Sequence, residues 1–194
     1  MPTGTTPLPP VLRLAPVERR HLQDIAGLAR LWQADPAEAG RDGDQGFVMS
    51  TWDAAEYGAF LGVAEKFLVL LREEEMAGFM LAYTHRHAHL DPMIHAEIAR
   101  YLPAYLLVEM ICIAPGWNGQ GLGSHFMSLA LDAAGELPVV SEVSSRPRNV
   151  ASERMHLRLG FIRLAELDKP DGFRTTIWVR YPPAVTRTSS PARS

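Results

Sequence analysis

The segment PGWNGQGLGSHF, residues 115–126, constrains the fold of this chain more than any other. Four glycines fall within eight positions, between the nearly uninterrupted apolar run YLLVEMICIA and a second run whose apolar residues recur at helical spacing. The first run is typical of a strand buried on both faces, and the second predicts a helix. Glycine reaches positive φ and lets a ligand approach the backbone, at a cost in stability elsewhere. The junction therefore predicts a strand-loop-helix unit that binds a ligand.

The glycine spacing excludes two known phosphate-binding loops. Gly116 and Gly121 have the Walker spacing, but Leu122 and Gly123 stand where that loop needs Lys and Ser or Thr. A dinucleotide fingerprint that starts at Gly121 needs a glycine at 126, where the chain has Phe126. The remaining interpretation is a helix start whose unpaired amides and positive dipole end suit a pyrophosphate. The alternative is a tight turn without a ligand.

The rest of the chain predicts elements in an order typical of a mixed sheet. Apolar and β-branched runs predict strands at 11–14, 67–71, 76–84, 105–114, 139–144, 161–167 and 173–181. Helical spacing predicts helices at 21–33, 51–61, 126–137 and 149–159, with Thr51 as the N-cap of the second and Ser124 near the start of the third. The long polar segment before residue 105 is expected to be functional and to carry a short helix. We therefore expect an α/β protein of mixed α+β type, with helices covering one mixed sheet.

Length and composition limit the classes of protein that this chain can represent. Its 194 residues predict one domain at 11–181 between unstructured segments at 1–10 and 182–194. A net charge of -3 provides no basic surface for nucleic acid, and a single cysteine excludes an intramolecular disulfide. Neither a signal peptide nor an apolar run of about 20 residues is found. We expect a cytoplasmic protein with no nucleic-acid or membrane partner.

The glycine junction resembles the acyl-CoA motif of the GNAT superfamily of N-acetyltransferases, Arg/Gln-x-x-Gly-x-Gly/Ala. Gly121 and Gly123 match both glycines of the motif, and Asn118 replaces its first residue. EMICIAP resembles the fourth strand of the family, and Asn149-x-x-Ser152 followed by RLGF resembles its fourth helix. The resemblance implies a central, mostly antiparallel mixed sheet with helices on both faces and a splayed strand pair. It also implies acetyl-CoA as the acyl donor.

The same resemblance implies which residues bind the donor. The pantetheine arm is expected along the opened fourth strand, and the diphosphate on the amides of the glycine loop. The expected binding residues are Ile111, Cys112, Ile113, Asn118, Gly119, Gln120, Gly121, Leu122, Gly123, Ser124, Asn149 and Ser152. For Asn149 and Ser152, capping of their own helix is the alternative interpretation.

Two residues are candidates for catalysis. Glu109 is the one charged residue in YLLVEMICIA, and burial raises the pKa of a carboxyl toward the range that a general base needs. The alternative is a Glu that pairs with Arg or caps a loop. His156 stands where the resemblance expects the tyrosine that protonates the CoA thiolate, and an imidazolium can do this. The alternative is a histidine that packs beside Arg158.

Two other chemistries are weaker interpretations of the sequence. Cys112 suggests a nucleophile with an acyl-enzyme, but a thiol between two isoleucines is typical of a small buried apolar residue. His85, His87, His89 and His95 suggest a metal site, but their spacing matches no zinc pattern, and we expect no metal. The same histidine segment can instead line the pocket of the acyl acceptor.

Together these patterns predict an acyl-CoA-dependent N-acyltransferase. It is expected to move an acetyl group from acetyl-CoA to a primary amine, on a small molecule or a peptide, by direct attack in a ternary complex. The alternative function is a non-catalytic acyl-CoA-binding sensor or regulatory module. Because many proteins of this superfamily pair through their C-terminal strands, a homodimer also stays open.

Overall fold

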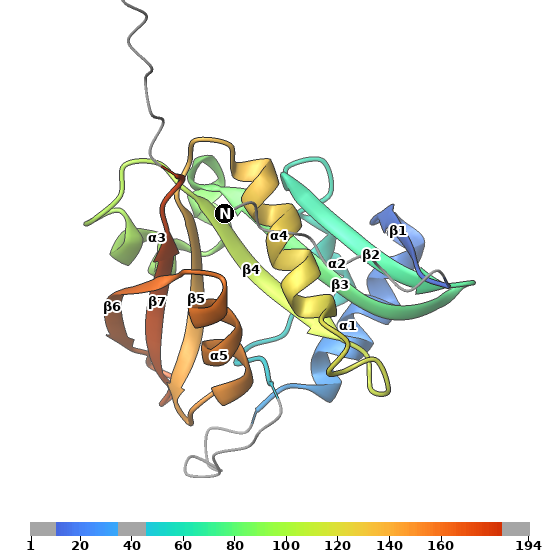
Figure 1. Ribbon diagram of the computed structural model, residues 1–194. Coiled ribbons are helices and arrows are strands. Elements are labelled where there is room, and N and C mark those ends of the chain that lie inside the picture. The colour runs from blue at the N-terminus through green and yellow to red at the C-terminus, as the bar shows by residue number, and fades with distance from the viewer. Residues whose placement is uncertain (1–10, 35–45, 184–194) are drawn as a thin grey trace, which may run out of the picture.

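A single seven-stranded sheet organises the part of the chain that the computed structural model describes, residues 11–34 and 46–183. Its order is β1-β2-β3-β4-β5-β7-β6, and only β4 and β5 run parallel (Figure 1). The expectations for residues 1–10 and 184–194 lie outside the described ranges. The strands are β1 Arg13–Pro16, β2 Lys66–Arg72, β3 Glu75–Thr84, β4 Leu106–Ile113, β5 Val139–Arg146, β6 Ile162–Asp168 and β7 Arg174–Arg180.

Helices cover both faces of this sheet. They are α1 Leu22–Leu31, α2 Ala54–Gly58, α3 Pro92–Ile98, α4 Leu122–Ala134 and α5 Val150–Arg158, with 3-10 turns η1 Arg19–His21 and η3 His85–Leu90. Figure 1 shows α4 and α5 in front of the sheet, with α1 and α2 behind it. We call these two sides the α4 face and the α1 face. The expected mixed sheet, mostly antiparallel and covered on both faces, is confirmed.

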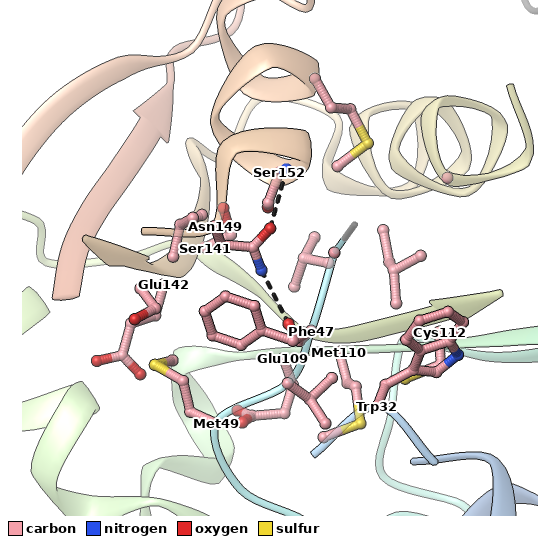
Figure 2. A pocket seen from close by; sticks show the side chains of 18 of the residues that line it. Trp32, Phe47, Met49, Glu109, Met110, Cys112, Ser141, Glu142, Asn149 and Ser152 are labelled. Carbon is pink, nitrogen blue, oxygen red and sulfur yellow. Dashed lines mark hydrogen bonds between the residues drawn. The ribbon is translucent and has the colours of Figure 1, made fainter. Parts of the chain in front are cut away.

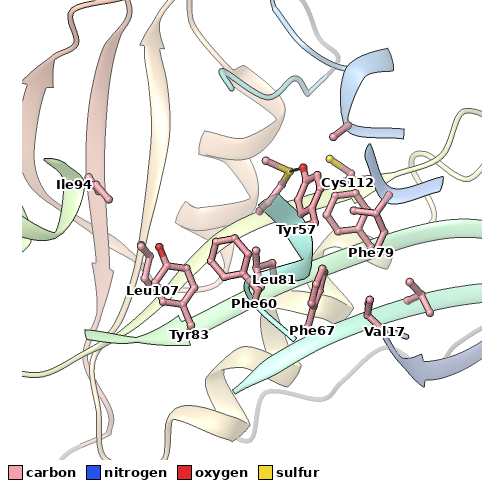
Figure 3. Packing of buried hydrophobic residues seen from close by; sticks show 14 of the residues in the cluster. Val17, Tyr57, Phe60, Phe67, Phe79, Leu81, Tyr83, Ile94, Leu107 and Cys112 are labelled. Carbon is pink, nitrogen blue, oxygen red and sulfur yellow. Dashed lines mark hydrogen bonds between the residues drawn. The ribbon is translucent and has the colours of Figure 1, made fainter. Parts of the chain in front are cut away.

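Alternation along the strands builds a separate hydrophobic core on each face. In β3, Phe79 packs on the α1 face with Tyr57 of α2, and Tyr83 packs there with Phe60, as Figure 3 shows. Met80 of the same strand packs on the α4 face against Phe126 of α4. Neighbouring strand residues point to opposite faces, so one apolar run supplies both cores. This explains why β3 and β4 read as nearly uninterrupted apolar runs rather than as alternating ones.

A β-bulge at Glu109 separates β4 into two parts. Leu81 pairs with Met110 while the next residue of β3 pairs with Val108, so Glu109 is an extra residue in β4. The parallel pairing of β4 with β5 covers only three pairs and ends at Val108 and Ser141. Beyond that point β5 stays paired with β7, and the β5-facing edge of β4 is open. The expected splayed strand pair is therefore present.

Two helix starts differ from the sequence prediction. The helix expected at 51–61 is short and begins after Asp53, not at Thr51. The side chain of Asp53 accepts two amide hydrogen bonds, and Glu56 bonds back to the Asp53 amide, so a capping box fixes the start there. The helix expected from 126 already begins at Leu122, which places Ser124 within its first turn. Helical spacing of apolar residues cannot reveal a first turn in which Leu122 is the one large apolar residue.

The long polar segment after β3 contains the expected short helix, α3. Ile94 and Ile98 of α3 are buried on the α1 face, so this segment closes that face near the end of β3. Its first residue is Pro92, which suits the first turn of a helix because proline lacks an amide hydrogen. The segment is thereby held against the sheet beside the opening between β4 and β5.

Candidate active site

The opening between β4 and β5 leads into a cavity of about 450 Å³. Figure 2 shows side chains from several separate segments turned toward it. The walls come from β4, β5, the start of α5, the glycine loop, and the segment 46–50, which crosses the opening. Residues that the sequence predicted for the site and that line this cavity are Glu109, Ile111, Cys112, Ile113, Asn118, Gly119, Gly123, Asn149, Ser152 and His156.

The backbone geometry of the glycine loop explains why the loop is rich in glycine. Gly116, Gly119 and Gly121 have φ of 87°, 76° and 79°, which other residues rarely adopt. Within the described residues, no atom beyond the chain neighbours lies within 4 Å of the position that a Cβ would take at any of the three. Gly123 has a different reason to be small, because a Cβ there would lie 3.4 Å from the Sδ of Met155 in α5. The loop is therefore bare on one side and close to α5 on the other.

The start of α4 leaves amides without partners. Its N-cap is Gly121, which has no side chain for capping, and the helical hydrogen bonds begin with the amide of His125 donating to the Gly121 carbonyl. In the described ranges, no group accepts a hydrogen bond from the amides of Leu122, Gly123 and Ser124. Such amides at the positive end of a helix dipole suit an anion. The arrangement can bind a phosphate group without a lysine.

The side chains of this loop divide into three kinds. Leu122 is buried in the core of the α4 face and anchors the loop. The amide nitrogen of Gln120 donates to the carbonyl of Gly116, 3.2 Å away, and stays at the surface. Asn118 stands at the rim of the cavity. For Gln120, the backbone rather than the side chain is therefore the part available to a ligand.

Beyond the bulge, only alternate peptide groups of β4 point into the opening. The amide of Ala114 donates to β3, and Cys112 pairs with Phe79 of β3, so the peptide groups of Ile111 and Ile113 point the other way. The indole nitrogen of Trp32 already donates to the carbonyl of Ile113, at 2.8 Å. Ile111 therefore offers the free strand edge. Cys112 does not, and burial raises the pKa of its thiol to about 12, which argues against a nucleophile.

Glu109 extends from the bulge toward the α1 face. The hydroxyl of Tyr83 donates to its Oε2 at 2.8 Å. Burial, together with the nearby charge of Asp91, raises the pKa of Glu109 to about 8, although the hydrogen bond from Tyr83 lowers it. The Tyr83 hydroxyl also has a raised pKa, first because of burial and then because of Glu109. A carboxyl with this pKa can exchange protons near neutral pH.

Three further charged residues complete this side of the cavity. The Nζ of Lys169 donates to Oε2 of Glu142 at 2.9 Å, and Thr175 donates to the other oxygen. The side chains of Lys169 and Glu142 are only 9% and 12% exposed, so they form a nearly buried ion pair with little net charge. Asp91 precedes α3, and within the described residues its carboxylate makes no hydrogen bond or ion pair. Lys169 is the cation near both Asp91 and Glu142, so these three side chains leave one net negative charge beside Glu109.

His156 lies on the opposite side, under α5, and is 2% exposed. Its Nδ1 lies 2.7 Å from the carbonyl oxygen of Ser152, and its Nε2 is hydrogen-bonded to Oγ of Ser141. The carbonyl can only accept, so Nδ1 carries the hydrogen and Nε2 accepts the Ser141 hydroxyl. Burial lowers the pKa of His156, although the Ser152 carbonyl opposes this shift. The lowered pKa favours the neutral form of the ring, which packs on Phe161 and Trp178 rather than beside Arg158.

Asn149 joins two walls of the cavity. Its Oδ1 accepts the amide of Ser152 at 3.1 Å and caps α5, which is the alternative that the sequence left open. Its Nδ2 donates to the carbonyl of Phe47 at 2.8 Å. Figure 2 shows both bonds, one toward the helix and one toward the segment 46–50. Asn149 therefore also holds the segment that crosses the opening.

The histidine segment contributes to the cavity through other residues. Asp91 and Ile94 line it, whereas His95 is buried with its Nδ1 on the hydroxyl of Tyr105. Among the residues that the structure describes, no group of three or more His, Cys, Asp or Glu side chains is arranged to hold a metal ion. The structure thus gives the metal interpretation no support.

Comparison with known protein families identifies the family of this chain. The model of the acetyltransferase (GNAT) family matches residues 26–161. The chain belongs to this family. The matched range includes β4, the glycine loop, α4, β5 and α5, which are the elements that build the cavity. The resemblance of the glycine loop to the acyl-CoA motif is thus confirmed at the level of the family.

Solved structures agree with this GNAT fold. An N-acetyltransferase from Staphylococcus aureus is 15% identical, covers 87% of this chain and 100% of its own, and has a TM-score of 0.59. A Drosophila melanogaster polyamine N-acetyltransferase that forms N-acetylagmatine is 16% identical, covers 88% and 100%, and has a TM-score of 0.57. A chain of the NatC complex bound to Gag peptide and CoA is 14% identical, covers 88% and 98%, and has a TM-score of 0.60. At these identities the likeness concerns the fold.

Two further findings are negative. Among curated proteins, none matches this GNAT chain significantly. In the described ranges, no helix is both long enough and apolar enough to span a membrane.

Several cavity residues of this GNAT protein were missed from the sequence. Three separate places in the chain supply them: the segment before α3 supplies Asp91, β5 supplies Ser141 and Glu142, and the turn after β6 supplies Lys169. The polar segment before residue 105 did signal a functional region, and Asp91 belongs to it. For Glu142 and Lys169 the available signal was weak, because a Glu in a short strand and a Lys in a turn are common at surfaces. Ser141 gave no signal, because a serine is common in a strand that contains both polar and apolar residues.

Proposed function

We propose that this protein moves an acetyl group from acetyl-CoA to a primary amine by direct attack in a ternary complex. One observation carries the proposal: a helix start with unpaired amides lies beside a strand that opens at a bulge carrying Glu109. A diphosphate and a peptide-like arm need these two features, in this order, along one extended molecule. The CoA in the solved NatC complex, which shares the fold, supports this choice of donor.

The residues present fit such a donor. The amides of Leu122, Gly123 and Ser124 would hold its diphosphate, because anions bind favourably at helix starts. The free peptide group of Ile111 would pair with its pantetheine arm, as a peptide pairs with a sheet edge. Ile113 has a smaller part, since its carbonyl is taken by Trp32. The thioester would then lie at the point where β4 and β5 separate.

The acceptor side favours an amine that arrives as a cation. Asp91 and Glu142 together carry one negative charge more than Lys169 compensates, so the acceptor side has a net negative charge. Phe47, Met49 and Ile94 supply apolar surface beside these charges. Agmatine, the substrate of the Drosophila enzyme, is an alkylamine with a second cationic group, and a molecule of that class suits such a pocket. Charge attracts the ammonium, and apolar surface holds its chain.

Glu109 is the proposed general base. An ammonium must lose its proton before its nitrogen can attack a carbonyl, and the pKa of Glu109, about 8, matches this task near neutral pH. Tyr83 fixes the orientation of the carboxylate. Alignment of the two bound reactants supplies the main part of the rate increase, roughly 7 kcal/mol or more in favourable cases. The thiolate that departs needs a proton, and His156 stays the candidate, but as a neutral ring it must first take one up.

Two measurements test this proposal. Thermal unfolding with acetyl-CoA at 100 times its dissociation constant should show stabilisation by roughly 2.7 kcal/mol. Acetylation of a panel of amines should then favour alkylamines with a second positive charge over neutral aromatic amines. Binding without turnover on any amine would favour the sensor function instead. An absence of stabilisation at any concentration of acetyl-CoA would contradict both.

We also propose a cytoplasmic location for this reaction. The single cysteine, Cys112, is free and buried rather than used in a disulfide, which is usual for proteins of reducing compartments. Fractionation of cells that express the full chain would test this, and recovery with secreted proteins would contradict it.

A further inference from the structure

Ser141 and His156 form a hydrogen-bonded pair that acetyl transfer to an amine does not require. The hydroxyl of Ser141 donates to Nε2 of the ring, and the opposite nitrogen donates to the carbonyl of Ser152. An activated serine nucleophile has three parts. These are the hydroxyl, a neutral imidazole that accepts its hydrogen, and an acceptor that orients the imidazole. Both Ser141 and His156 line the cavity.

The position of this pair relative to Glu109 is the second observation. Ser141 closes the paired part of β4 and β5, opposite Val108, the residue just before the bulge. The side chain of Ser141 points to the α4 face, where it contacts α5, while Glu109 points to the α1 face, where it contacts Tyr83. The two residues therefore stand on opposite sides of the point where the strands separate. A thioester carbonyl is planar and can be attacked from either side.

We propose that Ser141 is a second nucleophile of this protein and gives it an amine-independent thioesterase activity. When no amine approaches from the Glu109 side, Ser141 takes the acetyl group from acetyl-CoA, and water then releases it as acetate. This inference rests on the thioester donor of the proposed function. It adds a separate outcome, hydrolysis, with its own nucleophile.

The steps balance in atoms and protons. Oγ of Ser141 forms a bond to the carbonyl carbon, and its hydrogen moves to Nε2 of His156. The carbon-sulfur bond breaks, and the imidazolium returns that proton to the sulfur, so free CoA leaves as a thiol. In the second half, water attacks the serine ester and gives a proton to Nε2, the carbon-Oγ bond breaks, and the proton returns to Oγ. The products are the unchanged enzyme and acetic acid, which ionises in water to acetate and a proton.

The surroundings of the pair fit this sequence of steps. A base must be neutral before it can accept a proton, and burial lowers the pKa of His156. The phenyl ring of Phe161 packs edge-on against the imidazole and limits its rotation. Hydrogen bonds and packing thus hold the ring in the orientation that serves Ser141.

The experiment uses the full chain with acetyl-CoA and no amine. Release of free thiol with time, and a gain of one acetyl group in the intact mass of the protein, are the expected results. Ser141→Ala should abolish the mass gain, and His156→Gln should lower thiol release about 10²- to 10⁴-fold, the usual effect of losing a general base. Ser145→Ala is the matched control, because Ser145 lies on the same strand but bonds to Arg174 away from the cavity. It should release thiol at the unaltered rate.

A conservative variant separates chemistry from folding. Ser141→Cys keeps a nucleophile at this position, so it should still become acetylated, whereas Ser141→Ala should not. Thermal stabilisation by CoA identifies variants that keep the binding site. If the unaltered protein acetylates an amine but never gains mass or releases thiol without it, the inference is overturned while the proposed function stands. Thiol release by Ser141→Ala at the unaltered rate would overturn it as well. Failure of the unaltered protein to bind CoA would overturn both.

Discussion

The two sides of the opening between β4 and β5 shift the pKa values of their titratable side chains in opposite directions. On the α1 face Glu109 has a raised pKa, and on the α4 face His156 has a lowered one. Burial is the first cause of both shifts, because a low dielectric disfavours the charged form of an acid and of a base alike. One physical effect therefore favours the uncharged form both of the Glu109 carboxyl and of the His156 ring.

The neighbours of these two groups account for the remaining difference. Asp91 and Glu142 lie near Glu109 and strengthen its hold on a proton, while Lys169 opposes them. Around His156 there are hydroxyl and carbonyl dipoles and aromatic rings, with Ser141 as its direct partner. The α1 face is thus suited to a cation that loses a proton, and the α4 face to a neutral hydroxyl that does so. Variants can test each side separately.

Glu109→Gln should have the largest effect. The amide keeps the shape of the side chain and can still accept the hydroxyl of Tyr83, but it cannot take a proton. We expect kcat/KM for the amine to fall about 10²- to 10⁴-fold, as for loss of a general base. Thiol release without amine, which uses the other side, should continue. Steady-state rates with and without amine measure both.

The matched control for this change is Glu166→Gln on β6, an exposed glutamate away from the cavity. It should leave both rates unaltered. Equal loss of amine transfer in both variants, or full kcat in Glu109→Gln, would remove Glu109 from the role of base.

The pH dependence of stability should separate the two faces by sign. Glu109 has a pKa of about 8 in the folded state and near 4.5 when unfolded, so between these values the folded state binds more protons. The free energy of unfolding should therefore fall as pH rises through this window, on the order of a few kcal/mol. His156 acts oppositely: its folded pKa lies below 6.5, so stability is lost as pH falls through that value.

Denaturant unfolding over a pH series measures both contributions. Glu109→Gln should flatten the decrease above pH 6.5, where less than half of the unfolded chains keep His156 protonated. His156→Gln should remove the loss of stability that His156 contributes as pH falls below 6.5. Parallel curves for the unaltered protein and Glu109→Gln above pH 6.5 would contradict the raised pKa of Glu109.

Gly121→Ala should weaken the binding of acetyl-CoA by about tenfold. A side chain at its φ of 79° costs roughly 1–2 kcal/mol, and relief of this strain would turn the amides at the start of α4. Gly27→Ala in α1 is the comparison, since within the described residues no atom lies within 4 Å of a Cβ there. That change should instead stabilise the fold by about 0.5–1 kcal/mol. Thermal titration with CoA gives both numbers, and unaltered affinity in Gly121→Ala would count against the loop as the diphosphate site.

Local sequence patterns predicted most of the fold. The run 105–114 and the helix at 149–159 agree with β4 and α5 within about one residue, because apolar runs and the cap at Asn149 are local signals. The glycine loop was predicted for the same reason, because Gly119 and Gly121 have positive φ, which glycine adopts far more easily than other residues. Thr51 was a wrong N-cap because Asp53, two residues later, forms the capping box.

The arrangement of the cavity could not be predicted in this way. Asp91, Ser141 and Lys169 meet only because the sheet brings β3, β5 and the turn after β6 to one edge of the opening. The lowered pKa of His156 comes from its burial, and its hydrogen-bond partner Ser141 lies fifteen residues earlier in the chain. Burial and partners that are distant in sequence determine these properties, and no motif within one element records them.

The segment that crosses the opening gives the smallest and most selective prediction. Asn149→Asp keeps an oxygen that caps the amide of Ser152 but loses the nitrogen that donates to the Phe47 carbonyl. Stability should therefore stay within about 0.5 kcal/mol, while Asn149→Ala loses the cap as well and about 1 kcal/mol. In both variants the segment 46–50 should loosen, and the KM for the amine should rise a few-fold. Because this segment covers both faces, amine transfer and thiol release should weaken together. A change in only one of them would show that the segment serves a single face.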